Sequence, residues 1–192
     1  MAYNFVINKI AEDVYEIENF LNTAELDEIF KIINAATEED WHDRNYIYDK
    51  SDFWYGKSLF LGEDNKIWKK AIFDKVDYMF PSYFWCEKEI KISRFKEQQQ
   101  IKPHRDNDTT PKGYYLGYGI VIYYNDDYLG GELEYPELGI TIKPKVGSAL
   151  IHGGEVLHGS LPVLNDSARY FSTVFMRGNE EKPTILNKEL FF

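Results

Sequence analysis

Residues 118–176 read YGIVIYYNDDYLGGELEYPELGITIKPKVGSALIHGGEVLHGSLPVLNDSARYFSTVFM, and this stretch decides the fold. Short apolar runs alternate with polar residues at a period of two, and glycine or proline separates the runs. This pattern is typical of short β-strands joined by turns. Because no helical pattern lies between the runs, the strands are expected to pair antiparallel rather than to form a Rossmann-type layer. The stretch therefore predicts a jelly roll or a small barrel.

The rest of the chain extends this β-rich region upstream and adds helices. The predicted strands are residues 91–95, 118–124, 132–135, 140–142, 149–151, 155–157 and 170–176. Asn22 can cap a first helix with Glu25 as its capping-box partner, and a second helix is predicted over about residues 65–79. We expect one domain over residues 1–192. In it, a helical support (about 1–85) packs on one sheet of a β core (about 89–178).

Composition narrows the class of protein. The chain has 192 residues and a formal net charge of −10, which disfavours a nucleic-acid partner because phosphate contacts need a basic surface. Cys86 is the only cysteine, so an intramolecular disulfide and a thiolate zinc cluster are excluded. The sequence shows neither a secretory signal nor an apolar run of membrane-spanning length. We therefore expect a cytoplasmic protein without a membrane partner.

Three side chains could bind a metal. His104 and Asp106 are two residues apart, so on a strand they would face the same side, and His158 follows on another predicted strand. For the first two alone, an exposed strand end is the simpler interpretation. Two imidazoles and one carboxylate together suit a non-haem Fe(II) with open coordination positions. Arg169 begins the last predicted strand, where it either leans out into solvent or faces the interior and needs an anion.

With these residues in place, residues 92–177 resemble the catalytic core of the Fe(II)/2-oxoglutarate-dependent dioxygenases, particularly the prolyl 4-hydroxylase-like branch. The resemblance rests on His-x-Asp, a His about fifty residues later, and a basic residue about ten residues beyond that. The ordered Gly130-Gly131-Glu132-Leu133 and Pro144-x-x-Gly147 passages add to it. It implies a double-stranded β-helix (jelly roll) and an oxidoreductase.

The resemblance also implies a set of roles. His104, Asp106 and His158 would bind Fe(II), and Arg169 would bind the distal carboxylate of 2-oxoglutarate. Tyr124 would reach the same carboxylate, and Thr173 could add a hydroxyl or pack in the core. Dioxygen would be the second cosubstrate and ascorbate the reductant, with no catalytic residue beyond the metal centre.

The implied reaction is hydroxylation of a prolyl residue in a protein or peptide, coupled to oxidative decarboxylation of 2-oxoglutarate. A free amino acid or another small molecule is the other substrate class. Trp54, Tyr55 and Tyr115 are the candidates for the substrate side, the last in a predicted loop over residues 107–116. The role of His152 is open: it lies beside the metal, behind the ligands or at the end of the barrel.

A second class of function fits the same fold. A cupin-like jelly roll could bind a metal or a ligand without oxygenase activity. Arg169 would have no role in such a domain, and a cupin normally offers His-x-His rather than His-x-Asp. We therefore favour the oxygenase.

Overall fold

The computed structural model describes residues 3–43, 56–61, 66–86, 90–109 and 115–192. The strands in these ranges are β1 (Val6–Ala11), β2 (Val14–Glu18), β3 (Trp41–Asp43), β4 (Lys57–Phe60), β5 (Trp85–Cys86), β6 (Lys91–Phe95), β7 (Ile101–His104), β8 (Tyr115–Tyr123), β9 (Leu133–Tyr135), β10 (Ile140–Ile142), β11 (Ala149–Gly153), β12 (His158–Ser160) and β13 (Arg169–Gly178). The α-helices are α1 (Thr23–Ala35), α2 (Lys66–Met79) and α3 (Lys188–Phe191), and the 3-10 helices are η1 (Glu38–Asp40), η4 (Asp106–Thr109) and η5 (Pro136–Leu138).

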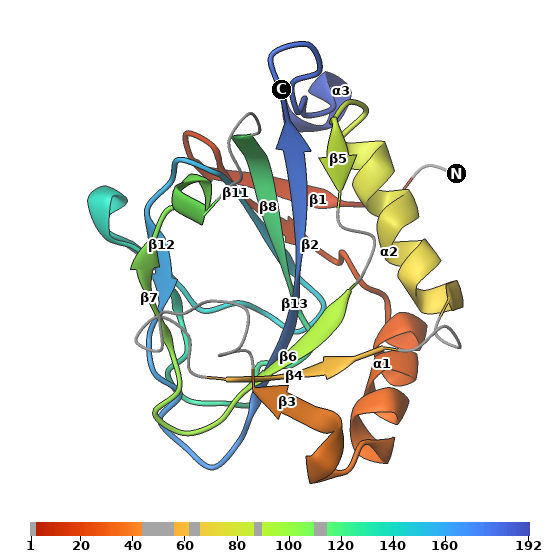
Figure 1. The fold of residues 1–192 in the computed structure, drawn as a ribbon, viewed down its shortest axis with the longest axis vertical. Helices are drawn as coiled ribbons and strands as arrows, with labels where there is room; N and C mark the ends of the chain where they lie inside the picture. The colour runs from red at the N-terminus through yellow and green to blue at the C-terminus, as the bar shows by residue number, and fades with distance from the viewer. Residues whose placement is uncertain (1–2, 44–55, 62–65, 87–89, 110–114) are drawn as a thin grey trace.

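Two β-sheets face one another and form a jelly roll (Figure 1). The larger sheet runs in the order β1-β2-β11-β8-β13-β6-β4-β3, with β5 beside β13, and the smaller runs β10-β9-β12-β7. All pairs between these strands are antiparallel, which confirms the sequence prediction. The predicted strand over residues 155–157 is wrong: these residues form a turn, and β12 begins only at His158.

The N-terminal segment, predicted to be helical, also adds a β-hairpin to the larger sheet. Strands β1 and β2 pair with each other, and β2 pairs with β11. Asp13 makes the tight turn between them with a φ of 55°, a conformation that aspartate tolerates better than most residues. Its carboxylate accepts a hydrogen bond of 2.8 Å from the Tyr118 hydroxyl on β8. The hairpin therefore lengthens the sheet that carries the core of the molecule.

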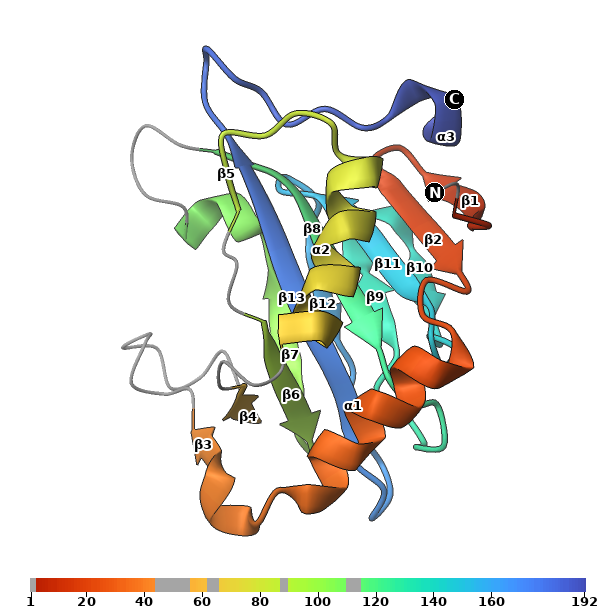
Figure 2. The same ribbon diagram turned by 90° about the vertical axis from the view of Figure 1, so that its right-hand side faces the viewer.

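Two helices cover the outer face of the larger sheet (Figure 2). Helix α1 begins where the sequence predicts, because Asn22 and Glu25 form a reciprocal capping box with hydrogen bonds of 2.8 and 2.9 Å. Ile29 of α1 and Ile72 of α2 are fully buried in one apolar cluster with Ile120 of β8. This cluster lies between the helices and the sheet.

A second apolar cluster fills the space between the two sheets. It combines residues of the larger sheet, such as Val121, Tyr123 and Phe171, with Leu133 and Tyr135 of the smaller sheet. Alternation along β8 explains the division, because Ile120 and Ile122 belong to the helix side and Val121 and Tyr123 to the interior. No helix in the described ranges is long and apolar enough to cross a membrane.

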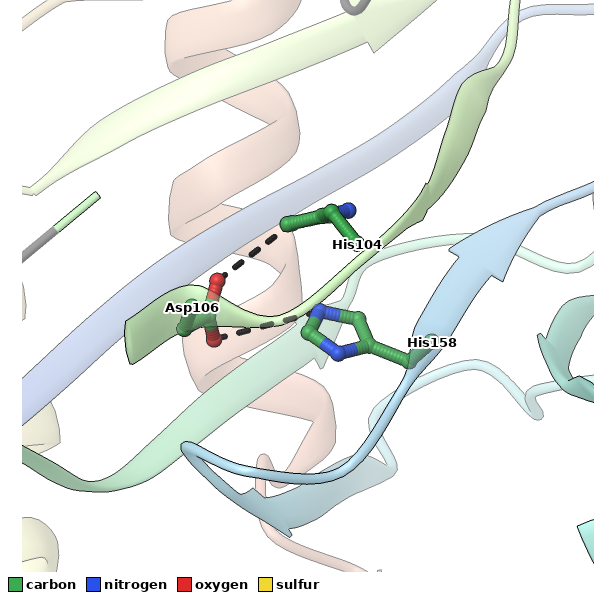
Figure 3. A group of neighbouring side chains, drawn as sticks. All are labelled: His104, Asp106 and His158. Carbon is green, nitrogen blue, oxygen red and sulfur yellow. Dashed lines mark ion pairs between the residues drawn. The ribbon is translucent and has the colours of Figure 1, made fainter. Parts of the chain in front are cut away.

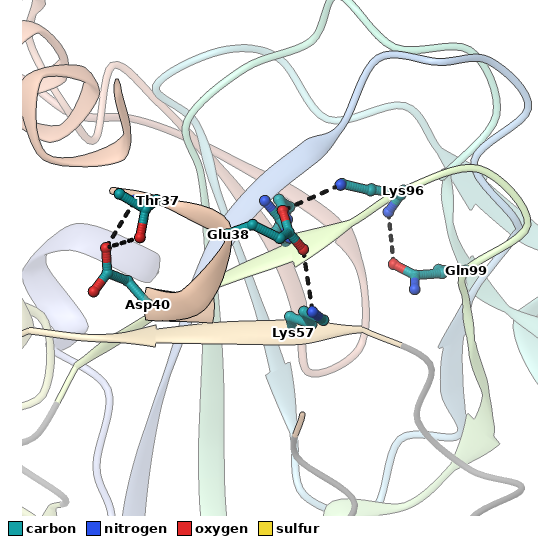
Figure 4. Close-up of polar contacts among 7 residues, drawn as sticks. Thr37, Glu38, Asp40, Lys57, Lys96 and Gln99 are labelled. Carbon is teal, nitrogen blue, oxygen red and sulfur yellow. Dashed lines mark hydrogen bonds and ion pairs between the residues drawn. The ribbon is translucent and has the colours of Figure 1, made fainter. Parts of the chain in front are cut away.

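A charge network joins η1 to the far edge of the larger sheet (Figure 4). The Glu38 carboxylate forms ion pairs with Arg94 at 2.7 Å, with Lys57 at 3.1 Å and with Lys96 at 3.4 Å. Hydrogen bonds from Arg94 and Lys57 lower the pKa of Glu38 to about 2. Because Glu38 itself is exposed, the network orients this edge more than it stabilises the fold.

Candidate metal centre

The three predicted ligands meet at the open edge between the two sheets (Figure 3). His104 ends β7, His158 begins β12, and the two residues are direct partners across these paired strands. The Asp106 Oδ1 atom lies 3.3 Å from His104 Nε2, and its Oδ2 atom lies 3.8 Å from His158 Nε2. The ligand atoms of all three residues lie within 4.8 Å of one another. The sequence prediction that these side chains converge agrees with this geometry.

Asp106 reaches the cluster by a different route from the one its spacing suggests. Strand β7 ends at His104, and Asp106 is the first residue of η4, so strand alternation does not bring the two together. Between them, the Arg105 guanidinium points away, donating to the Glu155 carbonyl and lying 2.5 Å from a Glu137 carboxylate oxygen. The turn from strand to 3-10 helix therefore places the carboxylate beside the imidazole.

Both ligand imidazoles are held in the tautomer that a metal requires. His104 Nδ1 lies 3.0 Å from the Lys102 carbonyl, and His158 Nδ1 lies 3.0 Å from the Val156 carbonyl. A carbonyl only accepts, so Nδ1 carries the proton in each ring, and the Nε2 lone pair faces the cluster. Such carbonyl contacts fix the orientation of metal-binding histidines.

Asn107 ties the two ligand-bearing segments together. Its backbone N–H donates to the Gly154 carbonyl at 3.1 Å, and its side-chain amide donates to a Glu155 carboxylate oxygen at 2.5 Å. The side-chain oxygen of Asn107, Oδ1, accepts a hydrogen bond from the Leu116 N–H at 2.5 Å. Asp106, the turn before His158 and the start of β8 are thus joined through one residue.

Burial and mutual contacts set the charge states of the ligands. Burial, with smaller contributions from neighbouring imidazoles, lowers the pKa of His158 to about 3. Burial alone would raise the pKa of Asp106, but its contacts with the neighbouring imidazoles of His104 and His152 outweigh burial and hold that pKa below its usual range. At neutral pH His158 is therefore a neutral imidazole and Asp106 an ionised carboxylate, the forms that bind metals.

Acidification is expected to destabilise the metal-free protein through His158. The pKa of His158 is about 3 in the folded protein and 6.5 in its usual state. At any pH between these two values, His158 binds a proton in the unfolded chain but not in the folded chain. The contribution of His158 to stability is therefore complete above pH 6.5 and is lost as the pH falls toward 3. In urea titrations, the free energy of unfolding should fall by up to about 1.4 kcal/mol per pH unit in this range.

Two variants separate this effect from general acid sensitivity. In His158→Gln the titrating group is gone, so the free energy of unfolding should depend less on pH than in the wild type. The exposed His42 on β3 offers a matched control, and His42→Gln should keep the wild-type pH dependence. Identical pH profiles for His158→Gln and the wild type would contradict the assignment.

Arg169 lies fully inside the molecule, between the two sheets. Its guanidinium carbon lies 4.8 Å from the Phe95 ring centroid and 4.6 Å from that of Phe171. Its Nη1 donates to the Gly131 carbonyl at 2.6 Å, and its Nη2 donates to Ser160 Oγ at 3.3 Å. Because Ser160 follows His158 by two residues on β12, one short strand contacts both the metal cluster and Arg169.

The charge of Arg169 has no carboxylate partner among the described residues, and its Nε has no hydrogen-bond partner. Burial lowers the pKa of this guanidinium, as expected for a cation held away from water without a counter-ion. A buried cation of this kind is costly unless it meets an anion. The interior is therefore arranged to receive a negatively charged group.

Three tyrosine hydroxyls in the same interior have no hydrogen-bond partner among the residues that the structure describes. They belong to Tyr123 on β8, Tyr128 in the following loop and Tyr135 on β9. Burial raises the pKa of all three, that of Tyr128 to about 12, so each remains a neutral donor. Gly131, with a φ of +66°, leaves room for the Tyr128 ring, which an added Cβ would approach to 3.0 Å. Sequence reasoning missed these tyrosines.

Tyr124, the tyrosine predicted to accompany Arg169, faces the other way. Its side chain belongs to the cluster on the helix side, and its hydroxyl lies 2.6 Å from Ser172 Oγ. The register of β8 and β13 explains the error, because Tyr123 is the partner of Phe171 and shares the interior face with it. The prediction for Tyr124 is therefore corrected in favour of Tyr123.

The remaining predicted site residues have mixed outcomes. Thr173 is half-buried on the same face of β13 as Arg169, and its role stays a prediction. Tyr115 is half-buried at the start of β8, where its hydroxyl donates to the Asn179 carbonyl at 2.9 Å. Trp54 and Tyr55 lie outside the described residues. No substrate role is assigned to any of these four by the geometry.

The donor set fits a divalent metal of the non-haem iron type. Two imidazole nitrogens and one carboxylate oxygen converge, and both rings are anchored through Nδ1. Residues 90–177 match the family model described as the 2OG-Fe(II) oxygenase superfamily. The matched range includes all three residues of the cluster. A comparison with curated proteins gave no match.

Solved structures of oxygenases share the fold. A viral collagen prolyl hydroxylase from Paramecium bursaria Chlorella virus 1, in complex with 2OG, has a TM-score of 0.66 at 17% identity, covering 88% of this chain and 99% of that one. A Trichoplax adhaerens prolyl hydroxylase with a hypoxia-inducible-factor peptide has a TM-score of 0.67 at 14% identity, covering 88% and 84%. HygX from Streptomyces hygroscopicus, with nickel and 2-oxoglutarate, has a TM-score of 0.61 at 12% identity, covering 88% and 83%.

Proposed function

We propose that the protein is an Fe(II)- and 2-oxoglutarate-dependent dioxygenase that hydroxylates a prolyl residue of a protein or peptide. The observation that carries this proposal is the pairing of two features in one interior. A His104–Asp106–His158 cluster suits Fe(II), and the buried, uncompensated Arg169 with its tyrosines suits a dicarboxylate. A cupin-like binding domain would leave the second feature without a purpose.

The residues of the chain divide the work of the reaction. His104, Asp106 and His158 would hold the iron, and Arg169 with Tyr123 would hold the distal carboxylate of 2-oxoglutarate. When bound, Fe(II) and 2-oxoglutarate would activate dioxygen, so that the substrate would gain a hydroxyl group and 2-oxoglutarate would be converted to succinate and CO2. The apolar walls formed by Phe95, Phe171 and their neighbours exclude water from this space. Helices α1 and α2 serve as the support of the larger sheet in this proposal.

We infer the substrate class from the names of similar solved structures. The viral and Trichoplax relatives are named as prolyl hydroxylases, the latter with a peptide bound, whereas HygX has also been solved with hygromycin B. We favour a prolyl peptide and make a small molecule the other arm of the test. Ascorbate as reductant and a cytoplasmic location complete the proposal.

Turnover tests the proposal directly. The protein with Fe(II), ascorbate and 2-oxoglutarate should release succinate, and a proline-containing peptide should increase the rate and gain about 16 Da by mass spectrometry. A gain of mass only in amino acids or other small molecules would redirect the substrate class. No succinate with any candidate, together with no 2-oxoglutarate binding by calorimetry, would contradict the function.

Adjacent tyrosines provide a matched test of the cofactor pocket. Tyr123→Phe removes a hydroxyl that faces Arg169, so the affinity for 2-oxoglutarate should fall by about 10- to 100-fold, as expected for a hydrogen bond to a charged group. Tyr124→Phe removes the contact with Ser172 on the helix side and should cost about 1 kcal/mol of stability without changing this affinity. Calorimetry on the Ni(II)-loaded proteins measures both. Equal affinity in the two variants would contradict the assigned faces.

A further inference from the structure

His152 is a fourth imidazole beside the metal centre. It lies on β11, is only 1% exposed, and its ring centroid is 3.8 Å from that of His158. Its Nε2 lies 3.4 Å from Asp106 Oδ2. Its Nδ1 has no hydrogen-bond partner in the described part of the chain. Burying an imidazole at this position requires a physical reason.

The strand opposite leaves space for this contact. Gly119 of β8 is the direct partner of His152 on β11. A Cβ on Gly119 would come within 3.2 Å of Asp106 Oδ2 and 3.3 Å of His152 Nε2. The absence of a side chain there lets the carboxylate and the imidazole meet.

We infer that His152 is a positioning residue, which donates its Nε2–H to Asp106 Oδ2 and so directs the other carboxylate oxygen, Oδ1, toward the metal. A carboxylate only accepts, so the nitrogen that faces it carries the proton. The Oδ1 atom lies 3.3 Å from His104 Nε2, whereas the Oδ2 atom lies 3.4 Å from His152 Nε2 and farther, at 3.8 Å, from His158 Nε2. A carboxylate that binds a metal through one oxygen leaves the other buried, and a donor must satisfy it.

A ligand role for His152 agrees less well with the geometry. Among the described residues, the atoms that gather within 4.8 Å belong to His104, Asp106 and His158. His152 is not among them, and its Nε2 atom lies 3.4 Å from Asp106 Oδ2. A three-ligand centre with His152 beside it keeps the remaining coordination positions open.

The test compares three variants that differ in the position of a donor. His152→Phe keeps a ring against His158 and has no donor. His152→Gln carries an amide N–H about as far from the backbone as Nε2, and His152→Asn carries the same amide one methylene shorter. Asn and Gln thus share their chemistry and differ in reach, so the comparison holds even where Phe fails to fold. His42→Gln at the exposed position is the control.

The measured quantities are metal affinity and coordination in the absence of 2-oxoglutarate. The dissociation constant for Ni(II) should rise about 10- to 100-fold in His152→Phe and His152→Asn, but His152→Gln should stay within about threefold of the wild type. The visible spectrum of the Co(II)-loaded protein should change in the first two, as the carboxylate reorients, and be retained in His152→Gln. Urea unfolding of the metal-free proteins reports stability separately.

The outcomes distinguish this inference from the proposed function on which it rests. Wild-type affinity in all three variants, or equal loss in His152→Asn and His152→Gln, would overturn the positioning role. A wild-type protein that binds neither Ni(II) nor Fe(II) would instead contradict the metal centre itself. Affinity restored by glutamine with the wild-type Co(II) spectrum would support the inference.

Discussion

Replacing Asp106 with alanine is expected to weaken Fe(II) binding by more than about 100-fold, beyond the effect typical of residues that only support a ligand. Asp106 is the single carboxylate of the cluster formed by the described residues. Without Asp106, only imidazole side chains of the cluster would bind the Fe(II) ion. The charge of the ion would then be buried without a negative charge from the cluster to balance it. Asp106→Asn, which keeps the shape of the side chain, should lose affinity to a similar degree.

Calorimetry with Ni(II) and the iron content of the purified protein measure this loss. Asp74→Ala is a suitable control, because Asp74 is a carboxylate on the exposed side of α2 that pairs with Lys70 at 2.5 Å. This control should bind metal as the wild type does. Near-normal affinity in both Asp106 variants, with folding intact, would show that the metal is held elsewhere.

The three residues of the candidate metal centre could be predicted from the sequence because residue type and order carry most of the information. His104 and Asp106 are two residues apart in the sequence, whereas β12, which carries His158, has no apolar pattern of its own. The structure differs from the prediction only in how Asp106 reaches the cluster, because Asp106 belongs to η4 and not to a continuing strand. The strand pattern left both directions of Arg169 open, and the structure shows that it is buried in the interior.

The interior around Arg169 could be predicted only in part, because its residues are brought together by pairing between strands that are far apart in the sequence. Tyr123 and Tyr124 are neighbours of the same type, and only the register that opposes Tyr123 to Phe171 shows which faces the interior. Tyr128 and Tyr135 lie outside any motif, and no local pattern marks them. Hairpin β1–β2 was missed for a related reason: its place is set by pairing with β11, far along the chain.

Replacing Arg169 with methionine is expected to abolish useful 2-oxoglutarate binding while the metal centre survives. Methionine roughly keeps the volume and flexibility of the side chain but removes the charge that the interior otherwise leaves without a partner. Losing one member of a buried, hydrogen-bonded charge pair costs about 2–5 kcal/mol, or roughly 30-fold to several-thousand-fold in affinity. Ni(II) affinity should change little, because no ligand atom belongs to this residue.

The stability of Arg169→Met separates a cofactor role from a structural one. In the ligand-free protein Arg169 is a desolvated cation, and its removal relieves that cost even as the contacts with Gly131 and Ser160 are lost. Arg94→Met is the matched control, because this buried arginine of β6 pairs with Glu38 on the far edge. The control should lose stability and keep 2-oxoglutarate binding. Equal loss of metal and 2-oxoglutarate in Arg169→Met would show that Arg169 supports the fold of the site rather than an anion within it.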